Sequence, residues 1–238
     1  MTALGLHDCS LDVFRGVRPR GHVRRLRWLI RLLTSLPNLA ALDLGDNYLA
    51  ENLGVILDAV QQPLEKLRLA CCDFTDADID SLVSSRHMTS LHELDTESCT
   101  SGLHGDAEVM SRRLLREFHR CSALRALHFA NNSLTDANEL FAAFSAGSWP
   151  LLESIDLSLN PVPAAEVTRL VSVALASCRN MRRLYLPMEG QQSVAVAAVS
   201  QAVAESGRRD LNVKTVPDDQ TIVVFDASSN ELQIPFFQ

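Results

Sequence analysis

The feature that most constrains this chain is a leucine pattern that occurs six times. Each copy reads Leu-x-x-Leu-x-Leu-x-x-Asn or Cys, or a variant with other apolar residues or Thr, and the last copy is degenerate. The central positions of the copies are Leu42, Leu67, Leu94, Leu127, Ile155 and Leu184, at intervals of 25 to 33 residues. A shorter version with Leu4, Leu6 and Cys9 precedes them. Self-similarity at this period is typical of a repeat architecture.

Each copy predicts one strand and one helix. The Leu-x-Leu alternation is typical of a short strand with one buried face, and the Asn or Cys that follows can turn inward and bond the backbone. Helical periodicity comes next, for example at Leu53, Ile56 and Val60. Thr75 and Thr135 precede two such segments, as N-caps do. One unit cannot bury its own apolar side, so the sequence predicts an α/β solenoid with a parallel concave sheet and convex helices.

We interpret residues 1–238 as a single repeat domain with about seven units. A basic insertion is expected near 12–22, a loop insertion near 98–105 and a terminal cap at 207–238. A first repeat without a polar cap indicates a piece of a longer solenoid, because terminal repeats normally need one. The cap is expected to contain strands near 211–213 and 225–230, with Phe225, Ile234, Phe236 and Phe237 covering the last repeat.

Composition and charge exclude several classes of protein. The chain is 47% hydrophobic, which excludes a disordered chain, and no apolar run reaches the ~18 residues of a membrane span. The N-terminus lacks the cationic start and apolar middle of a secretory signal, so we expect a cytoplasmic or nuclear protein. The net charge of −7 opposes nucleic-acid binding.

No motif of catalysis or cofactor binding is found in the sequence. It lacks a phosphate-cradling glycine loop, a paired-histidine zinc helix and a nucleophile elbow, and the adjacent Cys71 and Cys72 are poorly placed to bind one ion. We therefore expect no enzymatic activity, cofactor or metal. Five cysteines occupy repeat positions and are expected to be buried structural thiols: Cys9, Cys72, Cys99, Cys121 and Cys178.

The predicted concave face carries the best candidates for a binding site. Residues beside the buried leucine of each strand point away from the core. Exposed polar residues are common on any solvated strand, but solenoids bind their partners on such a surface. The centre, at Glu93, Asp95 and Glu97, is acidic, so we expect a partially basic protein partner. The predicted partner-binding residues are Asp43, Lys66, Arg68, Glu93, Asp95, Glu97, His128, Asp156, Arg183 and Tyr185.

A second candidate is the segment from Arg15 to Arg31, which contains seven arginines. In one interpretation it is a docking patch for an acidic protein, an anionic membrane surface or nucleic acid. In the other, an ordinary convex helix carries the arginines on its solvated face. The docking patch would comprise Arg18, Arg20, Arg24, Arg25 and Arg27, and the core stripe of the ordinary helix would comprise Val23, Leu26, Ile30 and Leu33.

Residues 62–72, residues 120–132 and the stretches 205–208 and 222–226 resemble the repeats of the PRAME family (preferentially expressed antigen in melanoma), which are of the ribonuclease-inhibitor type. The resemblance implies a leucine-rich-repeat horseshoe that binds proteins. For some relatives it implies a substrate receptor of cullin-type ubiquitin ligases, with elongin bound at a Leu and a Cys four residues later. Here Leu4 and Cys9 are five residues apart. The alternative is a ribonuclease-inhibitor-like protein that blocks a basic enzyme.

Overall fold

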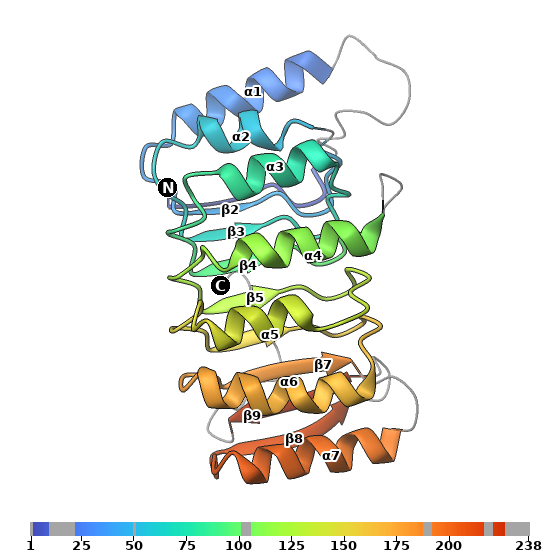
Figure 1. Ribbon diagram of the computed structural model, residues 1–238. Coiled ribbons are helices and arrows are strands. Elements are labelled where there is room, and N and C mark those ends of the chain that lie inside the picture. The colour runs from blue at the N-terminus through green and yellow to red at the C-terminus, as the bar shows by residue number, and fades with distance from the viewer. Residues whose placement is uncertain are drawn as a thin grey trace.

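The computed structural model describes residues 2–9, 22–49, 51–100, 106–187, 192–216 and 221–226. Strands and helices alternate along the chain, as the repeat predicts (Figure 1). The strands are β1 (Ala3–Gly5), β2 (Ala41–Asp43), β3 (Lys66–Arg68), β4 (Glu93–Asp95), β5 (Ala126–His128), β6 (Ser154–Asp156), β7 (Arg183–Pro187), β8 (Leu211–Val216) and β9 (Thr221–Asp226). The helices are α1 (His22–Thr34), α2 (Leu53–Ala59), α3 (Asp76–Ser84), α4 (Ala107–Phe118), α5 (Asn138–Ser145), α6 (Ala164–Ser177) and α7 (Gln192–Glu205).

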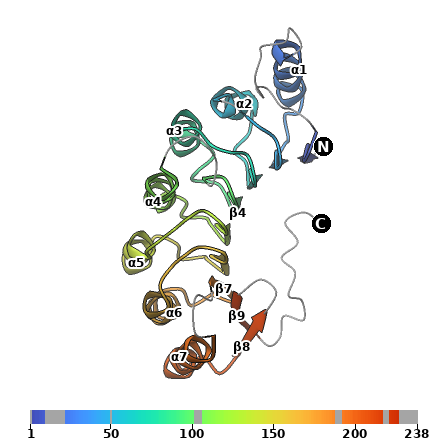
Figure 2. The same ribbon diagram turned by 90° about the vertical axis from the view of Figure 1, so that its right-hand side faces the viewer.

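The described strands form one sheet in the order β1-β2-β3-β4-β5-β6-β7-β9-β8. Neighbours from β1 to β7 are parallel, and the central apolar residues of successive repeats pair in register, as Leu42 does with Leu67 and Leu67 with Leu94. Figure 2 shows the strands on the inner side of a curved stack and the helices on its outer side. This arrangement confirms the predicted α/β leucine-rich-repeat solenoid.

The C-terminal strands depart from the predicted parallel sheet. β9 is antiparallel to both β7 and β8. Only residues 217–220 separate β8 from β9, and so short a connection joins antiparallel strands, because a parallel pair needs a crossover of about a dozen residues. The second predicted strand also begins earlier than expected, at Thr221. Phe225 is half-buried, and the remaining predicted cap residues 234, 236 and 237 lie outside the described part of the chain.

The inward Asn and Cys side chains form the predicted ladder between repeats. Asn132 donates to the carbonyl oxygen of Thr96 at 2.8 Å, and its own side-chain oxygen accepts from the backbone N–H of Cys99 at 3.0 Å. The thiol of Cys72 donates to the carbonyl of Leu44 at 3.1 Å. Each bond reaches the preceding repeat. Cys9, predicted to be buried, is exposed, because no described repeat precedes its own.

The residue before each ladder side chain has a positive φ. The values are +55° for Asp46, +58° for Cys71, +55° for Ser98, +52° for Asn131 and +58° for Leu159. Ser98 therefore belongs to a regular repeat turn, and the following Cys99 and Thr100 are buried. The insertion predicted at 98–105 does not include these three residues, and 101–105 lie outside the described ranges, as do 10–21, which contain most of the basic insertion.

Two helix predictions are confirmed only in part. Thr75 and Asp78 form a capping box at the start of α3, as predicted. Thr135, in contrast, is not the N-cap of α5, because that helix begins at Asn138. In α1 the fully buried side chains are Leu29 and Leu33, so the core stripe is rotated from the predicted one. Leu26 is partly buried, Ile30 is half-buried, and the side chain of Val23 is outside the described part.

Candidate protein-binding surface

The sheet register brings the predicted concave residues into two columns. The last residues of β2 to β6 and the third residue of β7 align across neighbouring strands. A second column joins the first residues of these strands and includes Lys66, Glu93 and Arg183. The first column contains Asp43, Arg68, Asp95, His128, Asp156 and Tyr185.

Several of these residues are buried, although the sequence predicts that they face solvent. Asp43, Asp95 and His128 are buried, whereas Arg68, Asp156 and Tyr185 are partly accessible. Strands of a sheet lie only about 4.8 Å apart, so long side chains on one strand cover short ones on the next. The guanidinium of Arg68 lies between two carboxylates in this way, with Nε 3.1 Å from Asp95 and Nη1 3.8 Å from Asp43.

Burial shifts the pKa values of two side chains in the first column, Asp95 and His128. It raises the pKa of Asp95 to about 7, against the opposing effects of the Glu97 backbone N–H and of Arg68. It also lowers the pKa of His128 to about 4, with a further contribution from the charge of Arg68. His128 is therefore neutral at neutral pH and adds no positive charge to the concave face.

Aspartates of the column also serve the fold. The side-chain oxygens of Asp43, Asp95 and Asp156 accept from the backbone N–H two residues later at 2.9, 3.0 and 2.9 Å. These are Asx-turn bonds, which let the chain leave the strand. An Asp at the last position of a strand is the sequence pattern that indicates such a turn, but the sequence analysis did not use it.

Much of the predicted acidic centre is neutralised within the sheet. Glu93 pairs with Lys66 at 2.7 Å, and Asp95 pairs with Arg68. Outside the predicted set, Arg125 pairs with Glu153 at 2.7 Å on the neighbouring strand ends. These pairs reduce the net charge that a partner would meet.

Glu97 is the exception in the acidic centre. Its side chain is half-buried, and no described residue forms a hydrogen bond or ion pair with its carboxylate. Burial raises the pKa of Glu97, and the negative charges of Asp156 and Asp46 raise it further, while Arg68 opposes them. Asp46 was missed by the sequence analysis because it lies in the turn beyond β2. Asp46, Glu97 and Asp156, here called the acidic cluster, lie at the carboxyl ends of the strands.

At the other end of the column, β7 contributes Arg183 and Tyr185, both half-buried. Burial raises the pKa of the Tyr185 hydroxyl. Of the predicted basic patch, Arg24, Arg25 and Arg27 are exposed on α1, whereas Arg18 and Arg20 lie outside the described residues. The three described arginines of the patch are therefore on the helix at one end of the convex layer, separate from the concave columns (Figure 2).

Two of the buried cysteines are held in the protonated form by their surroundings. Burial raises the pKa of Cys121 to about 12 and that of Cys178 to about 11, so both thiols stay protonated at neutral pH. Within the described ranges, no group of three His, Cys, Asp or Glu residues is arranged to hold a metal ion. None of the described helices is long and apolar enough to cross a membrane.

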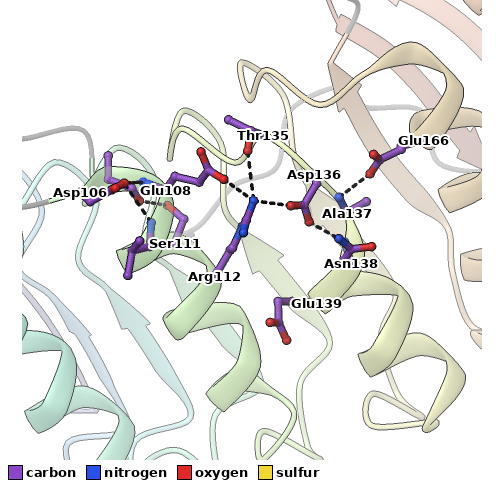
Figure 3. A network of polar contacts seen from close by, with 12 residues as sticks. Asp106, Glu108, Ser111, Arg112, Thr135, Asp136, Ala137, Asn138, Glu139 and Glu166 are labelled. Atoms are coloured by element: carbon purple, nitrogen blue, oxygen red, sulfur yellow. Dashed lines mark hydrogen bonds and ion pairs between the residues drawn. The ribbon is translucent and has the colours of Figure 1, made fainter.

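Ion pairs join neighbouring helices on the convex side (Figure 3). Arg112 of α4 contacts Glu108 of its own helix and Asp136 just before α5. Glu166 of α6 accepts from the backbone N–H of Ala137 at 2.7 Å. Arg116 pairs with Glu139 of α5 at 2.8 Å, and Arg113 pairs with Asp76 and Asp80 of α3. In this part of the convex layer, arginines are matched by carboxylates from adjacent helices.

The chain has detectable similarity to known proteins. It is 34% identical over 96 residues to leucine-rich repeat-containing protein 14 of Xenopus laevis, a match that covers 37% of this chain and 19% of that protein. The chain therefore spans about a fifth of the length of this curated relative. No family model matches the chain.

Two solved structures align with this protein at low sequence identity. The tropomodulin C-terminal domain of Caenorhabditis elegans aligns with a TM-score of 0.40 and 14% identity, over 77% of this chain and 94% of that one. An internalin from Listeria monocytogenes aligns with a TM-score of 0.41 and 16% identity, over 71% of this chain and 47% of that one.

Proposed function

We propose that this protein is a non-enzymatic module that binds a partner protein on its concave sheet, with Glu97 as the central contact for a basic side chain. The observation that carries the proposal is the Glu97 carboxylate itself. It is half-buried, the negative charges of Asp46 and Asp156 act on it, and Arg68, whose charge opposes them, forms no ion pair with it.

The acidic cluster favours a basic partner for an energetic reason. Like charges held near one another in a partly buried site raise the free energy of the unbound protein. A lysine or arginine of a partner removes that cost, and electrostatic complementarity of this kind also speeds association. Glu93 and Asp95 contribute less, because Lys66 and Arg68 already neutralise them.

The test begins with a partner identified by affinity purification and mass spectrometry and then purified. We expect Glu97→Lys to weaken the binding of this partner at least tenfold. The substitution replaces the central carboxylate with a positive charge, which repels the basic side chain of the partner. Glu205→Lys is the matched control, since Glu205 is exposed on the convex helix α7. Equal binding by wild-type protein and Glu97→Lys would refute this location of the site.

A narrower version of this function is a substrate-recognition role in a cullin-type ubiquitin ligase. The resemblance to the PRAME family supports it, although Leu4 and Cys9 do not have the spacing of an elongin-binding box. Co-purification of the full-length protein with elongin and cullin subunits would support this role. Their absence would leave a binding module that acts outside such ligases.

A second candidate is a ribonuclease-inhibitor-like protein that blocks a basic enzyme. The acidic cluster favours this alternative, because a basic active site is complementary to it in charge. A purified ribonuclease should lose activity on adding the protein and keep it on adding Glu97→Lys. Full activity in both mixtures would exclude inhibition of that enzyme.

A further inference from the structure

The edge of the sheet at which β7 begins carries several arginines. β9 runs beside β7 in the opposite direction (Figure 1), so the end of β9 lies at the start of β7, and Arg183 is paired in register with Phe225. Arg182 immediately precedes β7, and its carbonyl oxygen accepts from the backbone N–H of Asp226 at 2.8 Å. Arg179 lies in the turn between α6 and β7. Arg179 and Arg182 are exposed, and Arg183 is half-buried.

Arg208, from the segment between α7 and β8, joins this group. Its guanidinium donates to the carbonyl oxygens of Arg179 and Met181 at 3.1 and 3.0 Å. It also forms a bidentate pair with Asp210, with Nε 2.9 Å from Oδ1 and Nη2 2.7 Å from Oδ2. Arg208 therefore ties the segment before β8 to the turn before β7. The four residues of this group, here called the arginine edge, are Arg179, Arg182, Arg183 and Arg208.

Three residues of the arginine edge have no acidic partner. Within the described ranges, Arg179, Arg182 and Arg183 form no ion pair. Glu153 lies next to Arg182, whose backbone N–H donates to the Glu153 carbonyl oxygen at 2.7 Å. The Glu153 carboxylate nevertheless pairs with Arg125 on its other side, also at 2.7 Å. The arginine edge therefore has more positive charge than its neighbouring carboxylates match.

The sequence that continues from this edge contains little acid. Residues 227–238 follow Asp226 and include a single carboxylate side chain, Glu231. The stretches 188–191 and 217–220 are outside the described ranges, and they continue from the opposite ends of β7 and β8, at Pro187 and Val216. Most of the positive charge of the arginine edge is therefore available to another molecule.

We propose that the arginine edge binds a short carboxylate-rich segment of a partner protein. Arg179, Arg182 and Arg183 pair with its carboxylates in the bidentate manner that Arg208 already shows with Asp210. Arg208 has a positioning role, because it holds the turn that carries Arg179. β7 is three strands from β4 in the sheet, and the inference does not rest on the proposed contact at Glu97.

Other acidic molecules match the arginine edge less well. RNA and anionic membranes present phosphates over a wide area, so they would also meet the carboxylates of Asp210 and Asp226 and the net charge of −7. A second copy of the chain would offer Asp76 and Asp80 of α3, but these already pair with Arg113. A short run of Asp and Glu residues avoids both difficulties.

The test uses a fluorescently labelled peptide of about 10 residues, which spans about 33 Å when extended. The peptide alternates Glu with Gly and Ser, and a twin carries Gln in place of each Glu. We expect the acidic peptide to bind the full chain and its twin to bind at least tenfold more weakly, as measured by fluorescence anisotropy. Binding of the acidic peptide should weaken as salt increases, because salt screens the charges.

Variants locate the contact. Arg182→Glu with Arg183→Glu should weaken binding of the acidic peptide at least tenfold. Arg182→Gln with Arg183→Gln should also weaken it, but by less, and this pair keeps the test valid if the Glu variant does not fold. The matched control is Arg24→Glu with Arg27→Glu, which changes the net charge by the same amount at exposed positions of α1. Thermal midpoints show whether each variant is folded.

The concave site provides a further control. Glu97→Lys should leave binding of the acidic peptide intact, although it weakens the partner contact proposed for the acidic cluster. A failure of the arginine edge and a failure of the concave site can therefore be told apart.

Four results would overturn the proposal. One is that neither peptide binds, or that both bind equally. Another is that the α1 control weakens binding as much as the substitutions at Arg182 and Arg183, which would indicate attraction to the overall charge. The third is that an RNA oligonucleotide or anionic vesicles bind through these two arginines while the acidic peptide does not. The fourth is that sedimentation shows a dimer that Arg182→Glu with Arg183→Glu dissociates, which would make a second copy the occupant.

Discussion

The turn residue before each ladder side chain adopts a left-handed conformation, but the repeats place very different side chains there. Asp46 and Asn131 suit positive φ, because their short polar groups can bond to nearby backbone. Leu159, at φ +58°, has no such group. For such a residue Cβ approaches a carbonyl oxygen, which costs roughly 1–2 kcal/mol. Its side chain is 53% exposed, so burial offsets little of this strain.

We therefore expect Leu159→Asn to raise the free energy of unfolding by about 1 kcal/mol. Chemical denaturation measures the change. Leu151→Asn is the matched control, because Leu151 is also exposed but is absent from the positive-φ positions. An equal effect of both substitutions would show that surface polarity, rather than backbone strain, is responsible.

Individual residues also explain why the concave site was only partly predictable from the sequence. The alternation around Leu67 and Leu94 correctly places Arg68 and Asp95 in one column. It does not predict that Asp95 is buried, because that depends on the length and direction of the Arg68 side chain from the preceding repeat. Glu97 was identified for its charge, but its lack of a partner emerged only from the contacts.

Among the helices, Asp78 joins two repeats. Its carboxylate accepts from the backbone N–H and hydroxyl of Thr75 at 3.1 and 2.8 Å, which completes the cap of α3. It also accepts from the N–H groups of Glu51 and Leu53 at 3.2 and 3.3 Å. The N-cap residue of α2, Asn52, makes no side-chain cap bond, so Asp78 supplies the acceptor for that helix too.

Asp78→Asn should lower the free energy of unfolding by about 2–4 kcal/mol, because an amide nitrogen then faces buried N–H donors. Asp80→Asn should change it by less than about 0.5 kcal/mol, since Asp80 is exposed on the same helix. Urea denaturation of both variants tests the difference. A small effect of Asp78→Asn would mean that water caps α2 and α3 equally well.

Caps that a side chain of another repeat supplies also limit the prediction of helix boundaries from sequence. The α3 cap was recognisable, because Thr75 and Asp78 are three residues apart in the chain. The start of α5 was not, since the N–H of Ala137 is bonded by Glu166 from the following repeat. A cap supplied across repeats has no local sequence pattern.

At the scale of the whole molecule, buried titratable groups couple stability to pH. Asp95 has a pKa of about 7 when folded, against about 4 for an unfolded aspartate, so the folded state binds more protons between these values. This effect makes stability fall as pH rises from about 4 to 7. His128, with a folded pKa of about 4, has the opposite effect below pH about 6.5.

Asp95→Asn removes the first of these effects. Relative to wild type, the variant should gain about 2 kcal/mol of stability between pH 5 and pH 8, because wild-type Asp95 ionises in that window. Urea midpoints at pH 5, 6.5 and 8 measure the gain. A difference between the two proteins that stays constant with pH would contradict the raised pKa of Asp95.

By itself, the sequence determined the repeat, its strands and helices, the inward ladder and the columns of the concave sheet. These follow from periodicities of about 2 and 3.6 residues, which act within one repeat. Only the tertiary structure decided that Asp95 and His128 are buried, that the Glu97 carboxylate forms no ion pair with a described residue and that Trp28 is exposed. These properties depend on side chains one repeat away, which come into contact only when the repeats stack.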